Sequence, residues 1–179
     1  MRRLAATLLL LACSGLVSGC GLLADKDTTN AQAALETFRG EGFRIQLPCS
    51  PFERTDSVPM LGGDNLTVRI WMCEDDVSAY LVSTMKLPKG VPGDLDGAAQ
   101  GGADALNGTV SRQKKITFAG VPGREVRIES TYDGKPAVVF ARILVHQRTL
   151  YQVQLVQLDG GGEKPPSRYR KVADSLSFK

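Results

Sequence analysis

The chain has 179 residues, of which 42% are hydrophobic, 22 are Lys or Arg, 19 are Asp or Glu and one is His. A single histidine excludes multi-histidine metal centres. A charge balance this close to neutral gives no indication of the basic surface that nucleic-acid binding requires. The length fits one ordinary globular domain preceded by a shorter segment.

The first residues are typical of an export signal. Arg2 and Arg3 precede an apolar stretch of about a dozen residues, whereas a membrane-spanning helix needs ~20. The stretch leads into Leu16-Val17-Ser18-Gly19-Cys20, in which small residues and a cysteine follow aliphatic ones. We therefore expect a signal peptide over residues 1–19.

This ending resembles the lipobox of bacterial lipoproteins. The resemblance implies that the Cys20 thiol receives a diacylglycerol, that the signal is cut before Cys20, and that the new amine takes a fatty acid such as palmitate. Such a protein is held to a membrane on its extracytoplasmic side. A second sequence of this type ends at Cys13, but cleavage there would leave a hydrophobic region of only nine residues. The other alternative makes Cys20 a buried or disulfide cysteine of the folded domain.

Processing at Cys20 leaves Cys49 and Cys73 as an even pair in an oxidising compartment, which predicts a disulfide between them. A redox pair is the alternative, but redox cysteines are usually close in sequence.

Without Arg2 and Arg3 the mature chain has about one excess positive charge, so polybasic membrane attachment is not predicted either. Attachment is expected to come from the lipid alone.

The elements are predicted from hydrophobic periodicity. Residues 20–42 are interpreted as a lipidated tether with a short helix near 31–38. Alternating apolar residues predict strands over Phe43–Leu47, Leu66–Met72 and Ala79–Leu87, the last two forming a hairpin. Apolar and small residues at helical spacing predict a helix over Asp94–Leu106.

Four more strands are predicted in the second half, followed by a closing helix. The strands are Arg112–Phe118, Arg124–Thr131, Ala137–His146 and Leu150–Leu158, and the helix runs from Pro165 to Leu176. Asp133-Gly134 is a strong hairpin signal. Because hairpins dominate, we expect an α+β domain with a largely antiparallel sheet and helices packed on it.

Three short phrases resemble the PsbP-like fold of bacterial lipoproteins of the LpqN and DcrB type. They are the F-x-I-x-x-P-x-x-P phrase of Phe43–Pro51, the residues Gly120–Glu125 followed by Arg142 and Leu150-Tyr151, and the tail Asp174–Phe178. The resemblance covers Phe43 to Lys179. It implies a single domain over 43–179 with an α/β/α sandwich, and a protein that is accessory or binding rather than enzymatic.

No catalytic, cofactor or metal residues are predicted. His146 is interpreted as a solvated turn residue, Glu74-Asp75-Asp76 as a solvated turn, and Gly160–Lys164 as a flexible loop without the Ser or Thr of a phosphate loop. The expected function is therefore a membrane-anchored, non-enzymatic accessory or partner-binding lipoprotein of the bacterial envelope. The alternative is a carrier of a small apolar ligand held between sheet and helix, and a hydrolytic enzyme ranks last.

Overall fold

The computed structural model describes residues 34–59, 65–74, 78–158 and 160–179. The elements there are, in chain order, β1 Glu36–Gly40, β2 Phe43–Leu47, β3 Phe52–Pro59, β4 Asn65–Glu74, β5 Ser78–Lys86, α1 Leu95–Ala105, β6 Thr109–Phe118, β7 Val121–Tyr132, β8 Lys135–His146, β9 Thr149–Leu158, α2 Ser167–Asp174 and β10 Ser177–Phe178.

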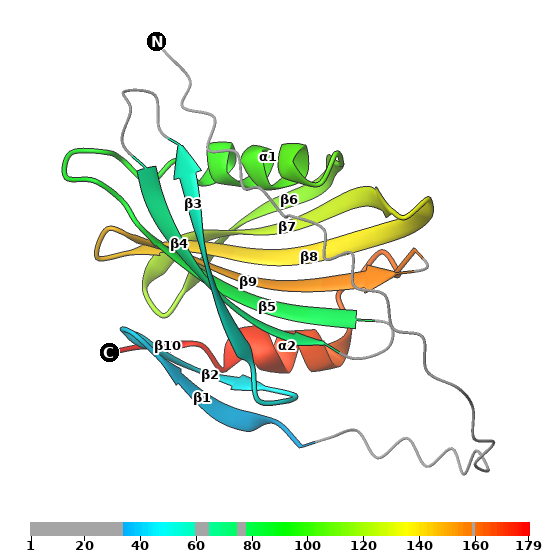
Figure 1. Cartoon of the computed structure of the whole chain (residues 1–179), viewed down its shortest axis with the longest axis horizontal. Helices are drawn as coiled ribbons and strands as arrows, with labels where there is room; N and C mark the ends of the chain where they lie inside the picture. Colours follow the sequence, from blue (N-terminus) through cyan, green and yellow to red (C-terminus); the bar gives the residue numbers. More distant parts are fainter. Residues whose placement is uncertain (1–33, 60–64, 75–77, 159) are drawn as a thin grey trace.

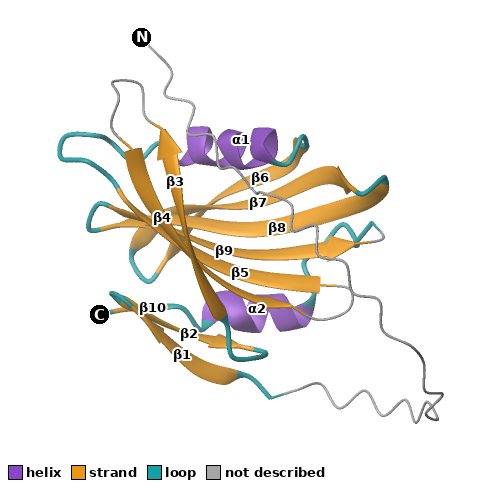
Figure 2. Cartoon of the chain, in the orientation of Figure 1, coloured by secondary structure: helices purple, strands orange, loops and turns teal. Residues whose placement is uncertain are grey.

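These elements form three layers (Figures 1 and 2). The central layer is a seven-stranded antiparallel sheet in the order β3-β4-β5-β9-β8-β7-β6. Helix α1 packs against β6, β7 and β8 on one face, which we call the α1 face. Helix α2 and a small antiparallel sheet, β1-β2-β10, lie on the opposite α2 face. The predicted α+β class with a largely antiparallel sheet is confirmed.

Tight hairpins build the centre of the large sheet. The β7–β8 turn contains Asp133 (φ 48°) and Gly134 (φ 75°), and the β8–β9 turn contains Gln147 (φ 47°) and Arg148 (φ 60°). Paired positive φ angles are typical of the type I′ turn, whose twist matches that of the flanking strands. Both hairpins, and the β4–β5 hairpin, agree with the sequence-based prediction.

Each face of the large sheet has its own apolar core. On the α2 face, Phe43, Val82, Leu144 and Val172 are completely buried. On the α1 face, the helix contributes Ala99 and Ala103, which are also completely buried against residues such as Val126 and Ile143. The inward residues alternate along the strands with outward ones, so the same central strands supply both cores.

Helix α1 begins as predicted at an acidic cap. The Asp94 side chain accepts a hydrogen bond from the Gly97 backbone nitrogen at 2.9 Å, which satisfies one of the unpaired N–H groups of the first turn. A Cβ on Gly97 would lie 2.4 Å from an Asp94 oxygen, so any larger residue here would require the Asp94 side chain to shift. Asp96, in the first turn, pairs with Arg124 of β7 at 2.6 Å and ties the helix to the sheet.

Three of the strands are not predicted by the sequence patterns. β1 occupies the end of the predicted tether, so the helix expected near 31–38 and the tether assignment of residues 36–40 are wrong. These residues pair with β2 and place Phe38 against Trp71, a contact that lies beyond local sequence. β3 and the two-residue β10 are the other two.

Candidate interaction surface along strand β3

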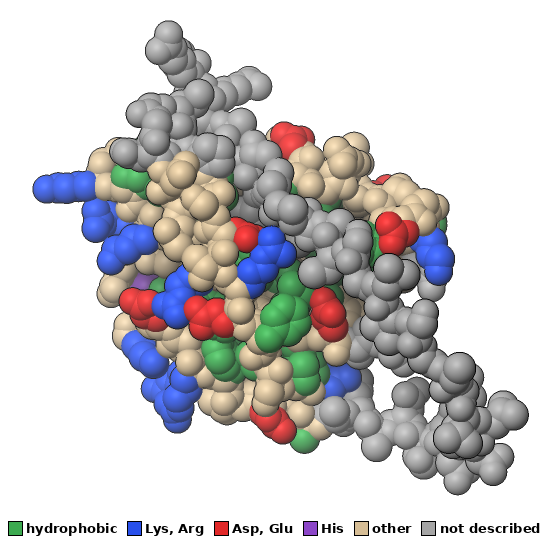
Figure 3. Space-filling view, viewed as in Figure 1, with side chains coloured by type: hydrophobic (Ala, Val, Ile, Leu, Met, Phe, Trp, Pro, Cys, Tyr) green, Lys and Arg blue, Asp and Glu red, His purple; other side chains and the backbone are tan. Residues whose placement is uncertain are grey.

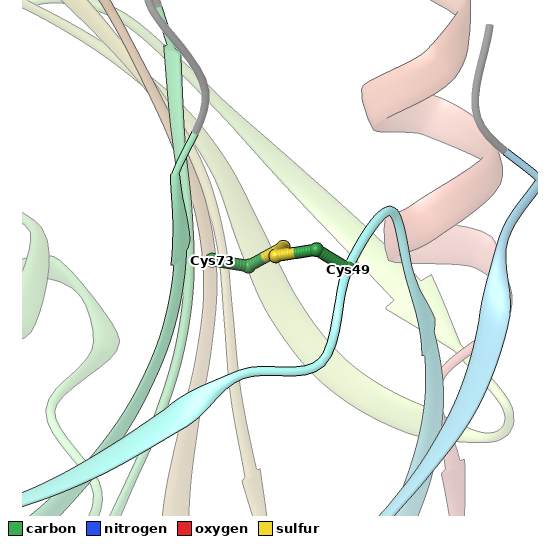
Figure 4. The surroundings of a disulfide bond; sticks show 2 residues. All are labelled: Cys49 and Cys73. Carbon is green, nitrogen blue, oxygen red and sulfur yellow. A yellow bond between two sulfur atoms is a disulfide. The ribbon is translucent and has the colours of Figure 1, made fainter.

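A disulfide joins Cys49 and Cys73, as predicted, with their Cα atoms 5.9 Å apart (Figure 4). Cys49 lies in the connection between β2 and β3, and Cys73 is buried on β4. The bond therefore fixes the start of β3 and also ties the small sheet to the large one. Cys20 and Cys13 lie outside the described residues, so lipidation at Cys20 stays a prediction.

Strand β3 forms one edge of the large sheet. It pairs with β4 over its whole length, from Phe52 opposite Met72 to Pro59 opposite Asn65. Within the described residues no strand pairs with its other side, so one row of its backbone groups is free to accept another strand. The opposite edge, β6, carries Arg112, Lys114 and Lys115, and such charges commonly protect edge strands from pairing.

The charged side chains around β3 form ion pairs within the domain. The Arg69 guanidinium donates to Glu53 at 2.9 and 2.7 Å and also pairs with Glu41 of the β1–β2 turn. Trp71 donates its indole N–H to Glu53 at 3.1 Å, and Arg69 lies over the indole ring at 5.2 Å. Hydrogen bonds from Arg69, and then from Trp71, hold the pKa of Glu53 below its ordinary value.

Further along β3, Arg54 pairs with Asp56 at 2.9 Å on the other face of the strand. With these pairs made, the edge presents backbone polar groups without a large net charge. The charges of β3 are therefore engaged within the domain.

Phe52, at the start of β3, is one of two large hydrophobic residues that are exposed in the described structure. Its exposed fraction is 53%, and that of Tyr132, at the far end of β7, is 47%. Figure 3 shows hydrophobic side chains at the surface on the side of the molecule where β3 lies in front. An exposed aromatic beside an open strand edge is the kind of anchor on which protein interfaces depend. We call Phe52 and the outer edge of β3 the β3 surface.

Arg142 of β8 is a buried charged group on the α2 face, and its contacts are structural. It lies 2.8 Å from Glu125 and 2.8 Å from Asp174 of α2, and its guanidinium lies 4.6 Å above the Phe118 ring. Burial lowers the pKa of Arg142, but the two carboxylates outweigh this effect and the pKa is raised. The arrangement fastens the end of α2 to the sheet.

His146 is another residue that was singled out in the sequence. The solvated turn predicted for His146 is wrong, because this residue ends β8 and its ring stacks on Phe178 with centroids 4.4 Å apart. Asp75 and Asp76 lie outside the described residues. In the described part of the chain, no three His, Cys, Asp or Glu side chains form a group that could hold a metal. Neither described helix is long and apolar enough to cross a bilayer.

No family model matches the chain, and no curated protein matches its sequence. Among solved structures, it is similar to cyanobacterial PsbP (CyanoP) from Synechocystis sp. PCC 6803, with a TM-score of 0.57 and 11% identity over 92% of this chain and 100% of that chain. A protein of unknown function from Pseudomonas aeruginosa matches at a TM-score of 0.40 and 9% identity, over 69% of this chain and 82% of that chain. The described domain therefore has a PsbP-like α+β fold.

Proposed function

We propose that this protein is a bacterial envelope lipoprotein, anchored through lipid on Cys20, whose PsbP-like domain binds a protein partner and does no chemistry. The observation that carries the proposal is the β3 surface, an open strand edge with an exposed aromatic at its start. The lipobox-like ending supports the anchor, and the resemblance to lipoproteins of the LpqN and DcrB type supports an accessory role.

The β3 surface fits partner binding by strand addition. In this mode a segment of the partner pairs with a free sheet edge through main-chain hydrogen bonds, and side-chain contacts add specificity. Phe52 would supply such a contact, and the Cys49–Cys73 bond holds the strand start in place before binding. Pre-organisation of this kind lowers the entropy lost on association.

A second candidate function is that of a carrier for a small apolar ligand, and a group of buried polar residues supports it. Ser83, Gln152 and Gln154 are buried polar residues on the α1 face, on β5 and β9, away from the strands that α1 contacts. The Gln154 amide donates to the Gln152 side-chain oxygen. A glutamine side chain both donates and accepts hydrogen bonds, so these residues would suit the polar end of a ligand. Native mass spectrometry of the membrane-extracted protein tests this candidate through an added small-molecule mass.

The partner-binding proposal is tested by site-specific photo-crosslinking in living cells. A photoreactive phenylalanine analogue replaces Phe52, or Thr55 further along the same strand, and a third variant carries it in place of Tyr132 as the control. Tyr132 is matched in exposure but lies away from β3. We expect the same protein adduct from the two β3 positions and no such adduct from the control. Equal adducts from all three positions, or none from β3, would contradict the proposal.

A further inference from the structure

The layer formed by α2 and the small sheet has more basic than acidic side chains on its outer surface. Its exposed side chains include two arginines of the small sheet, two basic residues of α2 and the C-terminal lysine. These are Arg39, Arg44, Arg170, Lys171 and Lys179, and we call them the basic surface. Figure 3 shows Lys and Arg side chains at the end of the molecule where the small sheet and the C-terminus lie.

The requirements of folding do not account for this cluster. Arg39 and Arg44 are directly opposite each other on β1 and β2, and like charges in that position destabilise a sheet. Neither has an ion-pair partner among the described residues. On the same layer Arg170 and Lys171 likewise lack a described ion-pair partner, and Lys179 donates to the Gly40 carbonyl at 3.2 Å.

The acidic groups of the layer only partly balance it. Glu41 shares Arg69 with Glu53, and Asp174 shares Arg142 with Glu125, so these two acidic groups are each only partly neutralised from the large sheet. Glu36 of β1 is a further acidic side chain of this layer. The near-neutral total charge of the chain therefore conceals an uneven distribution, and the basic surface carries an excess of positive charge.

The chain before the domain leads to this same layer. Glu36, the first residue of β1, follows Cys20 by 16 residues, a length that reaches at most about 55 Å. A lipid on Cys20 would thus keep the small sheet close to the bilayer at a high effective concentration. Anionic phospholipid headgroups attract basic groups that lie within a Debye length of the surface.

We infer that the anchored domain docks against an anionic phospholipid bilayer through its basic surface. This inference rests on the lipid anchor of the proposed function. Docking in this orientation turns the α1 face away from the membrane, because α1 lies on the opposite side of the large sheet (Figure 1). The β3 surface, at a sheet edge, stays accessible to a partner beside the membrane.

The test uses the full-length gene product, purified as the processed lipoprotein and reconstituted in vesicles that carry a headgroup quencher. A fluorophore is attached at Thr37→Cys, on the outer face of β1, or at Gln100→Cys on α1 as the distal reference. The mass of the intact protein is measured first and shows whether Cys20 carries lipid. A missing anchor is thereby distinguished from a lipidated domain that does not dock. An unlipidated product is tested for flotation with the same vesicles.

We expect quenching at position 37 but not at position 100 in phosphatidylglycerol vesicles, and we expect it to be lost at high salt or in phosphatidylcholine alone. Each basic residue near the surface contributes about fivefold to the docking constant, so Arg39→Gln/Arg44→Gln is expected to lower it about 25-fold. The matched control is Arg112→Gln/Lys114→Gln on β6, which removes the same charge elsewhere and is expected to leave docking unchanged.

Three results would overturn the inference. They are equal quenching in both lipids, equal effects of the two double variants, and no quenching at position 37 in a lipidated protein. The third result would leave an acidic protein partner as the occupant of the basic surface.

Discussion

Loss of the Cys49–Cys73 disulfide is expected to destabilise the domain by about 3.5 kcal/mol. The two cysteines are 24 residues apart, and the chain-entropy estimate for closing such a loop in the unfolded state gives this value. For a domain of this size, 1 kcal/mol shifts the melting temperature by about 2–4 °C, so the expected decrease is about 10 °C. The bond is therefore a large fraction of the 5–15 kcal/mol typical of a folded domain.

Urea denaturation of the wild-type protein with and without reductant measures this difference at constant sequence. The Cys49→Ala/Cys73→Ala variant is the second measurement, and it is expected to be destabilised somewhat more, because Cys73 is only 2% exposed and its removal leaves a void. In the double variant, reductant should have no effect. A loss below about 1 kcal/mol on reduction would refute the reasoning, because the unfolded chain would then gain little freedom from the open loop.

Three further predictions follow from contacts of the two helices. Gly101 is buried, so Gly101→Ala should destabilise the domain by about 1–3 kcal/mol through overpacking. Gly102 is half-buried, and a Cβ at this position would contact only Ile128, at 3.9 Å. Gly102→Ala should therefore stabilise the domain by up to about 1 kcal/mol, as measured by thermal unfolding. Hydrogen bonding to Arg124 lowers the pKa of Asp96, so the ionised side chain contributes its full stabilisation above the ordinary carboxyl pKa and loses it as the pH falls through the pKa of the folded state. Asp96→Asn should therefore reduce the fall in the free energy of unfolding at acid pH. An unchanged fall would contradict this. The Tyr169 hydroxyl donates to the Val153 carbonyl at 2.9 Å, so Tyr169→Phe should cost about 1 kcal/mol in urea, and no change would show that the bond adds nothing.

The sequence predicts those parts of the fold in which a strand or helix buries one regular face. The central strands β8 and β9 are a further case, because both their faces are buried and most residues of Ala137–His146 and Leu150–Leu158 pack against one core or the other. β3 is different, because Phe52 is exposed and Val58 is the one buried residue between positions 52 and 58. An edge strand with one partner needs little apolar alternation, so periodicity does not reveal it.

The candidate site is less predictable than the fold. The disulfide follows from cysteine arithmetic, but the open edge of β3 follows from which strand ends up outermost in the sheet. The pairing of Arg69 with Glu53 and Glu41 depends on β3, β4 and the β1–β2 turn meeting in space. The basic surface is likewise hidden in the total charge, because Arg39 and Arg44 come into the same layer as Arg170 and Lys171 only when the small sheet and α2 pack together.

The central claim, a disulfide-stapled domain held outside the cytoplasm by lipid on Cys20, is tested most directly by the intact mass of the protein extracted from bacterial membranes. We predict a chain that begins at Cys20, carries a thioether-linked diacylglycerol and an amide-linked fatty acid, and lacks the two hydrogens lost in forming the Cys49–Cys73 bond. A chain with any other N-terminus, an unmodified Cys20, or two free thiols at Cys49 and Cys73 would contradict it.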